Sequence, residues 1–190
     1  MCGEVYVCRT TYINWLEDSG LLVDEQCGFR RNRGCLDHIY SLYSVINDRK
    51  LSRLSTFSCF IDLEKAFDNV NRDCLWYKLQ KYGINGKLSN AVKSLYDNTA
   101  STVRVNNHLT TLFPILCGVK QGCLIHPTLF AIFINDLATQ IKSMNKGIDI
   151  DGTHLSILLY ADDIVILAPN ESNLQCMLNC VNEWCKGTTI

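Results

Sequence analysis

The chain has 190 residues, 47% of them hydrophobic, so it can bury one substantial core but not several independent ones. Its 18 Lys and Arg against 19 Asp and Glu give a formal net charge of −1, which lacks the basic excess of a strong nucleic-acid binder. No apolar stretch is long enough to span a membrane, and the first residues lack the pattern of a secretory signal. We therefore expect an intracellular protein, of nucleus or cytoplasm, with reduced thiols.

The first informative block is residues 25–38, where Gly28 stands among polar and basic side chains. Positive charge gathers locally at residues 30–33, although the chain as a whole is not basic. Helical spacing predicts one helix over residues 6–17 and another over residues 35–49. Taken alone, the basic residues are as typical of solvated surface as of a phosphate-binding site.

The second block, residues 56–70, begins as an apolar, aromatic strand that ends at Asp62, and a short turn then carries the chain to Asp68. Helices are predicted next, over about 71–82 and 87–97. A hairpin over residues 101–113 follows, because its two halves alternate around Asn106-Asn107, a sequence that favours a tight turn.

The third block, residues 114–137, opens as a loop in which Gly118 and Gly122 permit a close backbone approach to a ligand. Pro127 then suits the first turn of an apolar helix that runs to about Ser143. Gln121, between the glycines, is a candidate contact to a base or sugar edge. Without the other blocks, a glycine-rich loop before a core helix would be the preferred interpretation.

The fourth block is Tyr160–Asp163, set between apolar runs at 155–159 and 164–168 that are typical of short buried strands. A hairpin here places two adjacent carboxylates at its tip, and a divalent cation would relieve their repulsion. An Asp-Asp turn alone is more often only a turn. If the strand before Asp62 is a neighbour, a third carboxylate joins the pair and favours two-metal chemistry on phosphate esters. A strand over 147–151 is predicted before the hairpin, and a helix over 171–186 after it.

In this order the blocks resemble motifs of reverse transcriptases, especially those of non-LTR (LINE-like) retrotransposons. Asp62 with residues 66–68 matches motif A, residues 118–130 match motif B, and Tyr160–Asp163 matches motif C, while residues 25–38 resemble the fingers segment that contacts template. The resemblance covers nearly the whole chain. It implies an α+β fold, a right-hand polymerase palm of antiparallel sheet and packed helices with part of the fingers.

The resemblance further implies a truncated reverse transcriptase domain, with partial fingers over about residues 1–55, palm over about 56–190, and the thumb absent. It implies Mg²⁺ as cofactor, with Mn²⁺ as a substitute, and an RNA template, a DNA primer and deoxynucleoside triphosphates as partners. The implied metal ligands are Asp62, Asp162, Asp163 and the Leu63 carbonyl, the first three being catalytic. The implied nucleotide contacts are Phe67, which would crowd the ribose 2′ position, Gln121 and Gly122, and the implied template contacts are Gln26, Phe29, Arg30 and Arg33.

One departure lies in motif B, where the family usually has Pro-Leu and a small hydroxyl residue before the proline. This chain has Leu124, Ile125 and the bulkier His126 there, as a tolerated change or as a lesion in a decaying copy. Three alternatives follow: an active RNA-directed DNA polymerase, a truncated and inactive retroelement remnant with at most weak RNA binding, or another two-metal enzyme such as a nuclease. The nuclease is disfavoured because hydrolysis needs no nucleotide-selecting loop.

Overall fold

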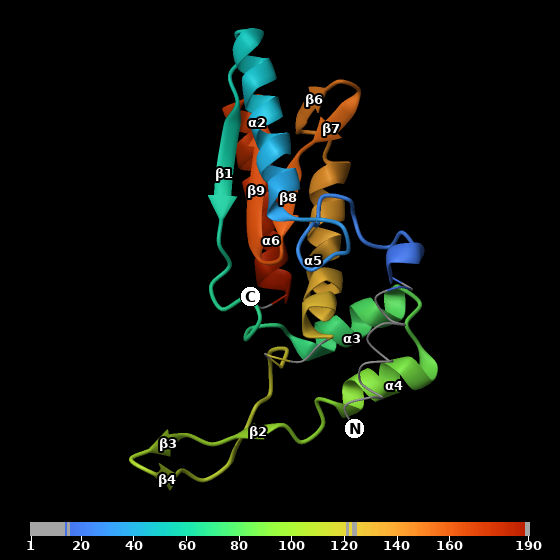
Figure 1. Ribbon diagram of the computed structural model, residues 1–190, viewed down its shortest axis with the longest axis vertical. Helices are drawn as coiled ribbons and strands as arrows, with labels where there is room; N and C mark the ends of the chain where they lie inside the picture. Colours follow the sequence, from blue (N-terminus) through green and yellow to red (C-terminus); the bar gives the residue numbers. More distant parts are fainter. Residues whose placement is uncertain (1–13, 15, 121, 123–124, 189–190) are drawn as a thin grey trace.

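A computed structural model describes residues 14, 16–120, 122 and 125–188 of the chain (Figure 1). Of the helices in these ranges, none combines the length and apolar composition needed to cross a bilayer. The helices are α2 (Cys35–Leu51), α3 (Arg72–Lys81), α4 (Gly86–Ser94), α5 (His126–Ser143) and α6 (Glu171–Thr188). The strands are β1 (Phe57–Ile61), β2 (Ala100–Ser101), β3 (Arg104–Val105), β4 (His108–Leu109), β5 (Phe113–Pro114), β6 (Ile148–Ile150), β7 (Thr153–Leu155), β8 (Ile157–Tyr160) and β9 (Asp163–Ala168).

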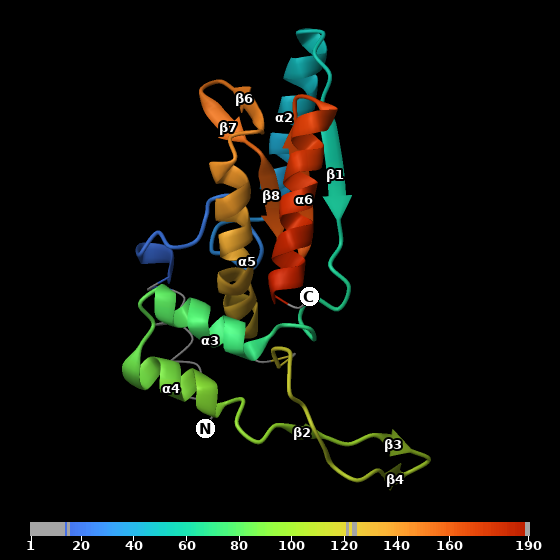
Figure 2. The same ribbon diagram turned by 180° about the vertical axis from the view of Figure 1, so that it is seen from behind.

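The body has three layers, with an antiparallel sheet in the order β1-β9-β8 between helices (Figures 1 and 2). Successive residues of a strand point to opposite faces of the sheet, so one apolar strand contributes side chains to a hydrophobic core on each face. Leu158 and Leu167 pack with Val45 of α2 on one face. Ile157 and Ile166 belong to the larger core on the other face, which is covered by α5 and α6.

The register of the sheet brings distant segments to the same end. In the β1–β9 pair, Phe57 lies opposite Ala168 and Ile61 lies opposite Ile164. The hairpin between β8 and β9 closes with Tyr160 opposite Asp163, so its turn has two residues. The carboxyl end of β1 therefore meets the tip of this hairpin.

Helix α5 is the centre of the larger core. Pro127 occupies its first turn, where the missing N–H costs nothing, and Phe130 and Phe133 are almost completely buried. Helix α3 packs against it and begins at Asn71, whose side chain accepts a hydrogen bond from the Cys74 N–H at 3.1 Å. The sequence offers Asn71 or Asp73 as the cap of this helix, and the structure uses Asn71.

The elements that follow α3, from α4 to β5, lie below the sheet in Figure 1. Helix α4 ends at Ser94, three residues before the predicted end. The pairs β2–β5 and β3–β4 then form a projecting arm whose tip is the predicted Asn106-Asn107 turn, both with positive φ. The helix predicted over residues 6–17 lies mostly outside the described residues.

The apolar face of α2 differs from a typical amphipathic helix. Of the residues that form its apolar stripe, Leu36, Ile39, Tyr43 and Ile46 are exposed, and only Leu42 packs partly against a core. The helix rests on the sheet chiefly through Val45. Its stripe therefore faces away from the sheet.

A partly buried ion pair joins three helices of the larger core. Lys78 of α3 is 7% exposed; its Nζ donates to the Phe133 carbonyl at 2.6 Å and to Asp136 Oδ1 at 2.8 Å. The Trp184 indole N–H of α6 donates to the same Asp136 oxygen at 3.0 Å. Burial lowers the pKa of Lys78, while the carboxylate of Asp136 opposes that shift.

Asp136→Ala should destabilise the chain because it leaves the Lys78 ammonium buried without its counter-charge. We expect a loss of about 2 kcal/mol in the free energy of unfolding, measured by urea denaturation. The double variant Lys78→Met/Asp136→Leu removes both charges and should recover most of that loss. Equal stability of Asp136→Ala and the native chain would contradict this role of the pair.

Candidate active site

Three aspartates lie at the same end of the sheet, where β1 stops and the hairpin turns. Asp62 directly follows β1, Asp162 lies in the two-residue turn, and Asp163 begins β9. Because Ile61 pairs with Ile164, the chain leaves β1 at Asp62 beside Asp163. The neighbouring strands assumed from the sequence are thus confirmed, and residues a hundred positions apart meet.

The charges of these carboxylates act on one another. Burial raises the pKa of Asp162, and the negative charges of Asp163 and Asp62 raise it further, against a lowering backbone hydrogen bond. Over the ranges described by the structure, no group of three or more His, Cys, Asp or Glu side chains lies close enough together to hold a metal ion. The donors are hard carboxylate oxygens that repel one another, which is the chemistry that suits Mg²⁺.

The turn after Asp62 begins with Leu63, whose backbone oxygen is the next acceptor along the chain. The Leu63 side chain is buried, and its carbonyl accepts the Ala66 N–H at 3.3 Å. A carbonyl oxygen has two lone pairs, so this bond leaves acceptor capacity for a second partner. The turn continues through Lys65, which has a φ of +50° and whose carbonyl accepts the N–H groups of Asp68 and Asn69.

The glycine-rich loop docks onto this same turn. The Gly118 N–H donates to the Val70 carbonyl and the Val119 N–H to the Phe67 carbonyl, both at 2.9 Å. Gly118 has a φ of +79°, and a Cβ at this position would lie 2.6 Å from the Asp68 carbonyl oxygen. Only glycine fits both the backbone conformation and the close approach.

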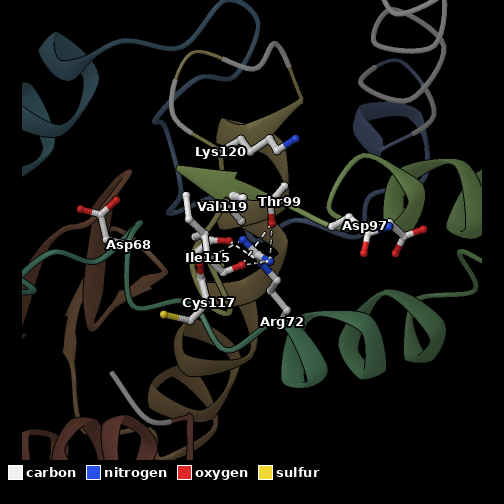
Figure 3. A pocket seen from close by; sticks show the side chains of 11 residues that line it. Asp68, Arg72, Asp97, Thr99, Ile115, Cys117, Val119 and Lys120 are labelled. Carbon is white, nitrogen blue, oxygen red and sulfur yellow. Dashed lines mark hydrogen bonds between the residues drawn. The ribbon is translucent and has the colours of Figure 1, made fainter. Parts of the chain in front are cut away.

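Arg72, the first residue of α3, fixes the other side of the loop (Figure 3). Its guanidinium donates to the carbonyls of Ile115, Cys117 and Gly118 at 2.8–3.0 Å and to the Thr99 hydroxyl at 3.1 Å. These groups line an open cavity of about 530 Å³, with Asp68 and Asp97 at opposite ends in the view of Figure 3.

Arg72 is not among the site residues expected from the sequence motifs. A signal was nevertheless present, because a basic residue at the start of a helix lies at the unfavourable positive end of the helix dipole. Such a placement indicates that the side chain forms favourable interactions elsewhere. Here the guanidinium donates hydrogen bonds to loop carbonyls that accept none from a strand or helix.

Phe67 stands between the turn and the first residues of α5. Its ring meets the Phe130 ring at a centroid distance of 4.4 Å and the His126 ring edge-on at 5.0 Å. His126 is 7% exposed, and burial lowers its pKa while the charge of Asp68 opposes the shift. The departure from motif B therefore bears directly on the side chain expected to crowd the ribose.

The structure places two of the four expected template contacts inside the fold. Gln26 is 1% exposed and hydrogen-bonded to the hairpin turn. The Arg30 side chain is 7% exposed and forms an ion pair with Glu17 at 2.7 Å, while it also donates to the Val23 carbonyl at 2.8 Å. Both side chains are thus engaged inside the fold, and their expected contacts with template stay predictions.

The other expected contacts lie at the surface. Phe29 is 60% exposed although it is apolar, and its φ of +59° is a conformation that a bulky residue seldom adopts. Arg33 forms a partly exposed ion pair with Asp24 at 2.6 Å. Gly122 is exposed with a φ of +81°, and Gln121 lies outside the described residues.

Comparison with known protein families gives one match that covers almost the whole chain. Residues 8–190 match the family described as reverse transcriptase (RNA-dependent DNA polymerase). The chain is 26% identical over 171 residues to the RNA-directed DNA polymerase from the mobile element jockey of Drosophila melanogaster, a match that covers 87% of this chain and 18% of that protein. It is 30% identical over 158 residues to the retrovirus-related Pol polyprotein from the type-1 retrotransposable element R2 of Popillia japonica, covering 82% and 22%. The chain thus spans about a fifth of the length of these relatives.

Comparison with solved structures identifies the fold. Telomerase from Candida tropicalis, in complex with a fragment of telomeric RNA, superposes with a TM-score of 0.72 at 13% identity, over 99% of this chain and 32% of that one. The apo telomerase of the same organism gives 0.69 at 14% identity, over 97% and 38%. The expected α+β arrangement of polymerase palm and fingers is confirmed.

His126 should make folding stability depend on pH. Its folded-state pKa is lowered below the ordinary value of about 6.5, so protons favour the unfolded chain as pH falls below that value. We expect the free energy of unfolding to decrease between pH 7 and pH 5.5, and the decrease to be smaller in His126→Leu. Urea denaturation across this range measures it, and identical slopes in both proteins would contradict the assignment.

Proposed function

Because this chain belongs to the reverse transcriptase (RNA-dependent DNA polymerase) family, we propose that it adds deoxynucleotides to the 3′-hydroxyl of a DNA primer on an RNA template. Relatives from retrotransposons support the same activity. The observation that carries the proposal is the meeting of Asp62 with the Asp162-Asp163 turn at one end of the sheet, beside the glycine-rich loop.

The donor set fits a divalent cation, and we assign Mg²⁺ to it, with Mn²⁺ as a substitute. Asp62, Asp162 and the Leu63 carbonyl would hold the metal, with Asp163 beside them. When bound, such ions activate the attacking hydroxyl and offset charge on the leaving phosphate. The chain itself contributes placement, because the carboxylates extend from a strand end and a two-residue hairpin turn, which are rigid supports.

The nucleotide would lie between the carboxylates and the loop. Phe67 is held against the first turn of α5 and is the proposed barrier to a ribose 2′-hydroxyl. Gln121 and Gly122 would border the nucleotide and template base. The hydrogen bonds from Gly118 and Val119 to the turn keep loop and carboxylates in one unit, so the nucleotide would meet both together.

The template would approach from the segment after Gln26. Phe29 offers an exposed aromatic face for stacking on a base, which is worth about 1–3 kcal/mol in single-strand binders. Arg33 offers partly exposed positive charge to a phosphate. We further propose that residues to about 55 act as part of the fingers and residues 56–190 as palm.

Asp162→Ala should abolish polymerisation because it removes a proposed metal ligand from the turn. The measurement is extension of a DNA primer on an RNA template with Mg²⁺ and deoxynucleotides, and we expect the rate to fall by at least about 100-fold. Asp149→Ala, an exposed carboxylate of β6, is the matched control and should keep the native rate. Undiminished synthesis by Asp162→Ala, or none by the folded native chain, would sink the proposal.

Phe67→Ala should relax discrimination against ribonucleotides, since it removes the side chain proposed to meet the 2′-hydroxyl. We expect the ratio of kcat/KM for dATP to that for ATP to fall by about tenfold or more. The variant also loses ring contacts to His126 and Phe130, so its melting temperature must be recorded. An unchanged ratio in a folded variant would remove Phe67 from this role.

A further inference from the structure

We propose that Gln26 is a positioning residue whose buried amide holds the hairpin turn and thereby sets the orientation of the Asp162 carboxylate. The inference rests on the proposed function for its catalytic consequence. The contacts that carry it stand independently of any activity.

One amide group engages both peptide bonds that flank Ala161. Gln26 Oε1 accepts the Ala161 N–H at 3.1 Å, and Gln26 Nε2 donates to the Ala161 carbonyl at 3.3 Å. The first contact fixes the peptide that enters Ala161, and the second fixes the peptide that leads directly into Asp162. The backbone just before the metal-ligand candidate is therefore held on both sides by one rigid group.

The chemistry of this contact requires an amide. Gln26 Oε1 accepts a second N–H, that of Gly28 at 2.8 Å, so its two lone pairs are both used while the nitrogen donates. A carboxylate of the same length would accept these N–H groups but would direct a second lone pair at the Ala161 carbonyl. It would also bring a fourth negative charge towards the three aspartates. Gln26 is 1% exposed, so water does not compete for these bonds.

The turn needs such support because its backbone is strained. Ala161 has a φ of +59°, in the left-handed region that a residue with a Cβ seldom adopts. A strained conformation of this kind persists when surrounding contacts over-determine it, and it is common at active sites. The Gln26 amide supplies contacts of that kind.

The segment that carries Gln26 is itself fixed to the sheet. The Cys27 N–H donates to the Leu159 carbonyl, and the Leu159 N–H donates to the Glu25 carbonyl, both at 2.9 Å. Glu25 in turn forms an ion pair with Lys142 of α5 at 2.7 Å. The segment is thus anchored to β8 two residues before the turn that it holds.

Gly28 shows how closely the segment approaches the turn. A Cβ at this position would overlap the Ala161 backbone nitrogen and approach its Cα to 2.9 Å. Gly28 is therefore required by contact with the turn. Gln26 and Gly28, which the sequence associates with template, instead face the catalytic hairpin.

The test is Gln26→Met in the full 190-residue chain, because methionine keeps the volume and removes every hydrogen bond of the amide. Two readouts do not depend on polymerisation. The first is hydrogen exchange of the Ala161 amide relative to that of Ile166 in the centre of the sheet, expected to quicken at least about tenfold. The second is Mn²⁺ affinity by electron paramagnetic resonance, expected to weaken about tenfold. Primer extension adds a third: kcat should fall by about 100-fold while KM for the primer–template is unchanged.

Asn135→Leu is the matched control. Asn135 is also a buried amide, 2% exposed, and it forms hydrogen bonds to Leu21 and Val23 of the same N-terminal segment. These bonds do not involve the hairpin turn. Its loss should lower the melting temperature without changing the relative exchange of Ala161 or the Mn²⁺ affinity. Equal effects of both variants on these readouts would mean general destabilisation and would overturn the positioning role.

The remaining outcomes are also decisive. Unchanged exchange and Mn²⁺ affinity in Gln26→Met would overturn the proposal, as would faster exchange with native affinity. If Gln26→Met does not fold, the native chain decides the matter, because an Ala161 amide that exchanges as fast as an exposed amide contradicts the contact. If the native chain binds Mn²⁺ but extends no primer, the proposed function fails, while the first two readouts still test Gln26.

Discussion

The antiparallel register of β1 against β9 is the constraint on which the site depends. The pairing of Ile61 with Ile164 brings Asp62 to the tip of the hairpin that carries Asp162 and Asp163. A shift by one residue would turn every side chain of β1 to the opposite face and move Asp62 along the strand. Bringing the like charges together is unfavourable, and the burial of the apolar residues that set this register offsets it. Ile164 and Ile166, for example, are almost completely buried between the sheet and its helices.

Two side chains from distant segments hold the glycine-rich loop and the hairpin turn in place beside the sheet. Arg72 gathers the carbonyls of the glycine-rich loop, and the Gln26 amide holds the peptides around Ala161. Both capture backbone groups that no helix or strand satisfies. Arg30 and Lys78 are likewise engaged inside the fold. Part of the positive charge of the chain is thus used inside the fold rather than at its surface.

The sequence predicted the elements well because each carries a strong local signal, such as the Asn71 cap, the Asn106-Asn107 turn and the alternation around the aspartates. It also predicted that Asp62 would join the Asp162-Asp163 turn if their strands are neighbours, and the β1–β9 pairing meets that condition. It failed where a residue type has two common uses. A basic residue such as Arg30 is either surface or core partner, and only the position of Glu17 in space decides between them. The exposure of the apolar stripe of α2 could not be predicted either, because helical spacing identifies an apolar face but not what covers that face.

The proposed site for a divalent cation lies where β1 ends beside the hairpin turn. Paramagnetic broadening of backbone amide signals by substoichiometric Mn²⁺ tests this site most directly, because the effect falls steeply with distance from the ion and needs no substrate. Signals of residues 61–63 and 161–164 should broaden first, while those of α4 stay sharp and Mg²⁺ in excess reverses the effect. Broadening that begins elsewhere, or that spares Asp62 and Asp162 together, would contradict it.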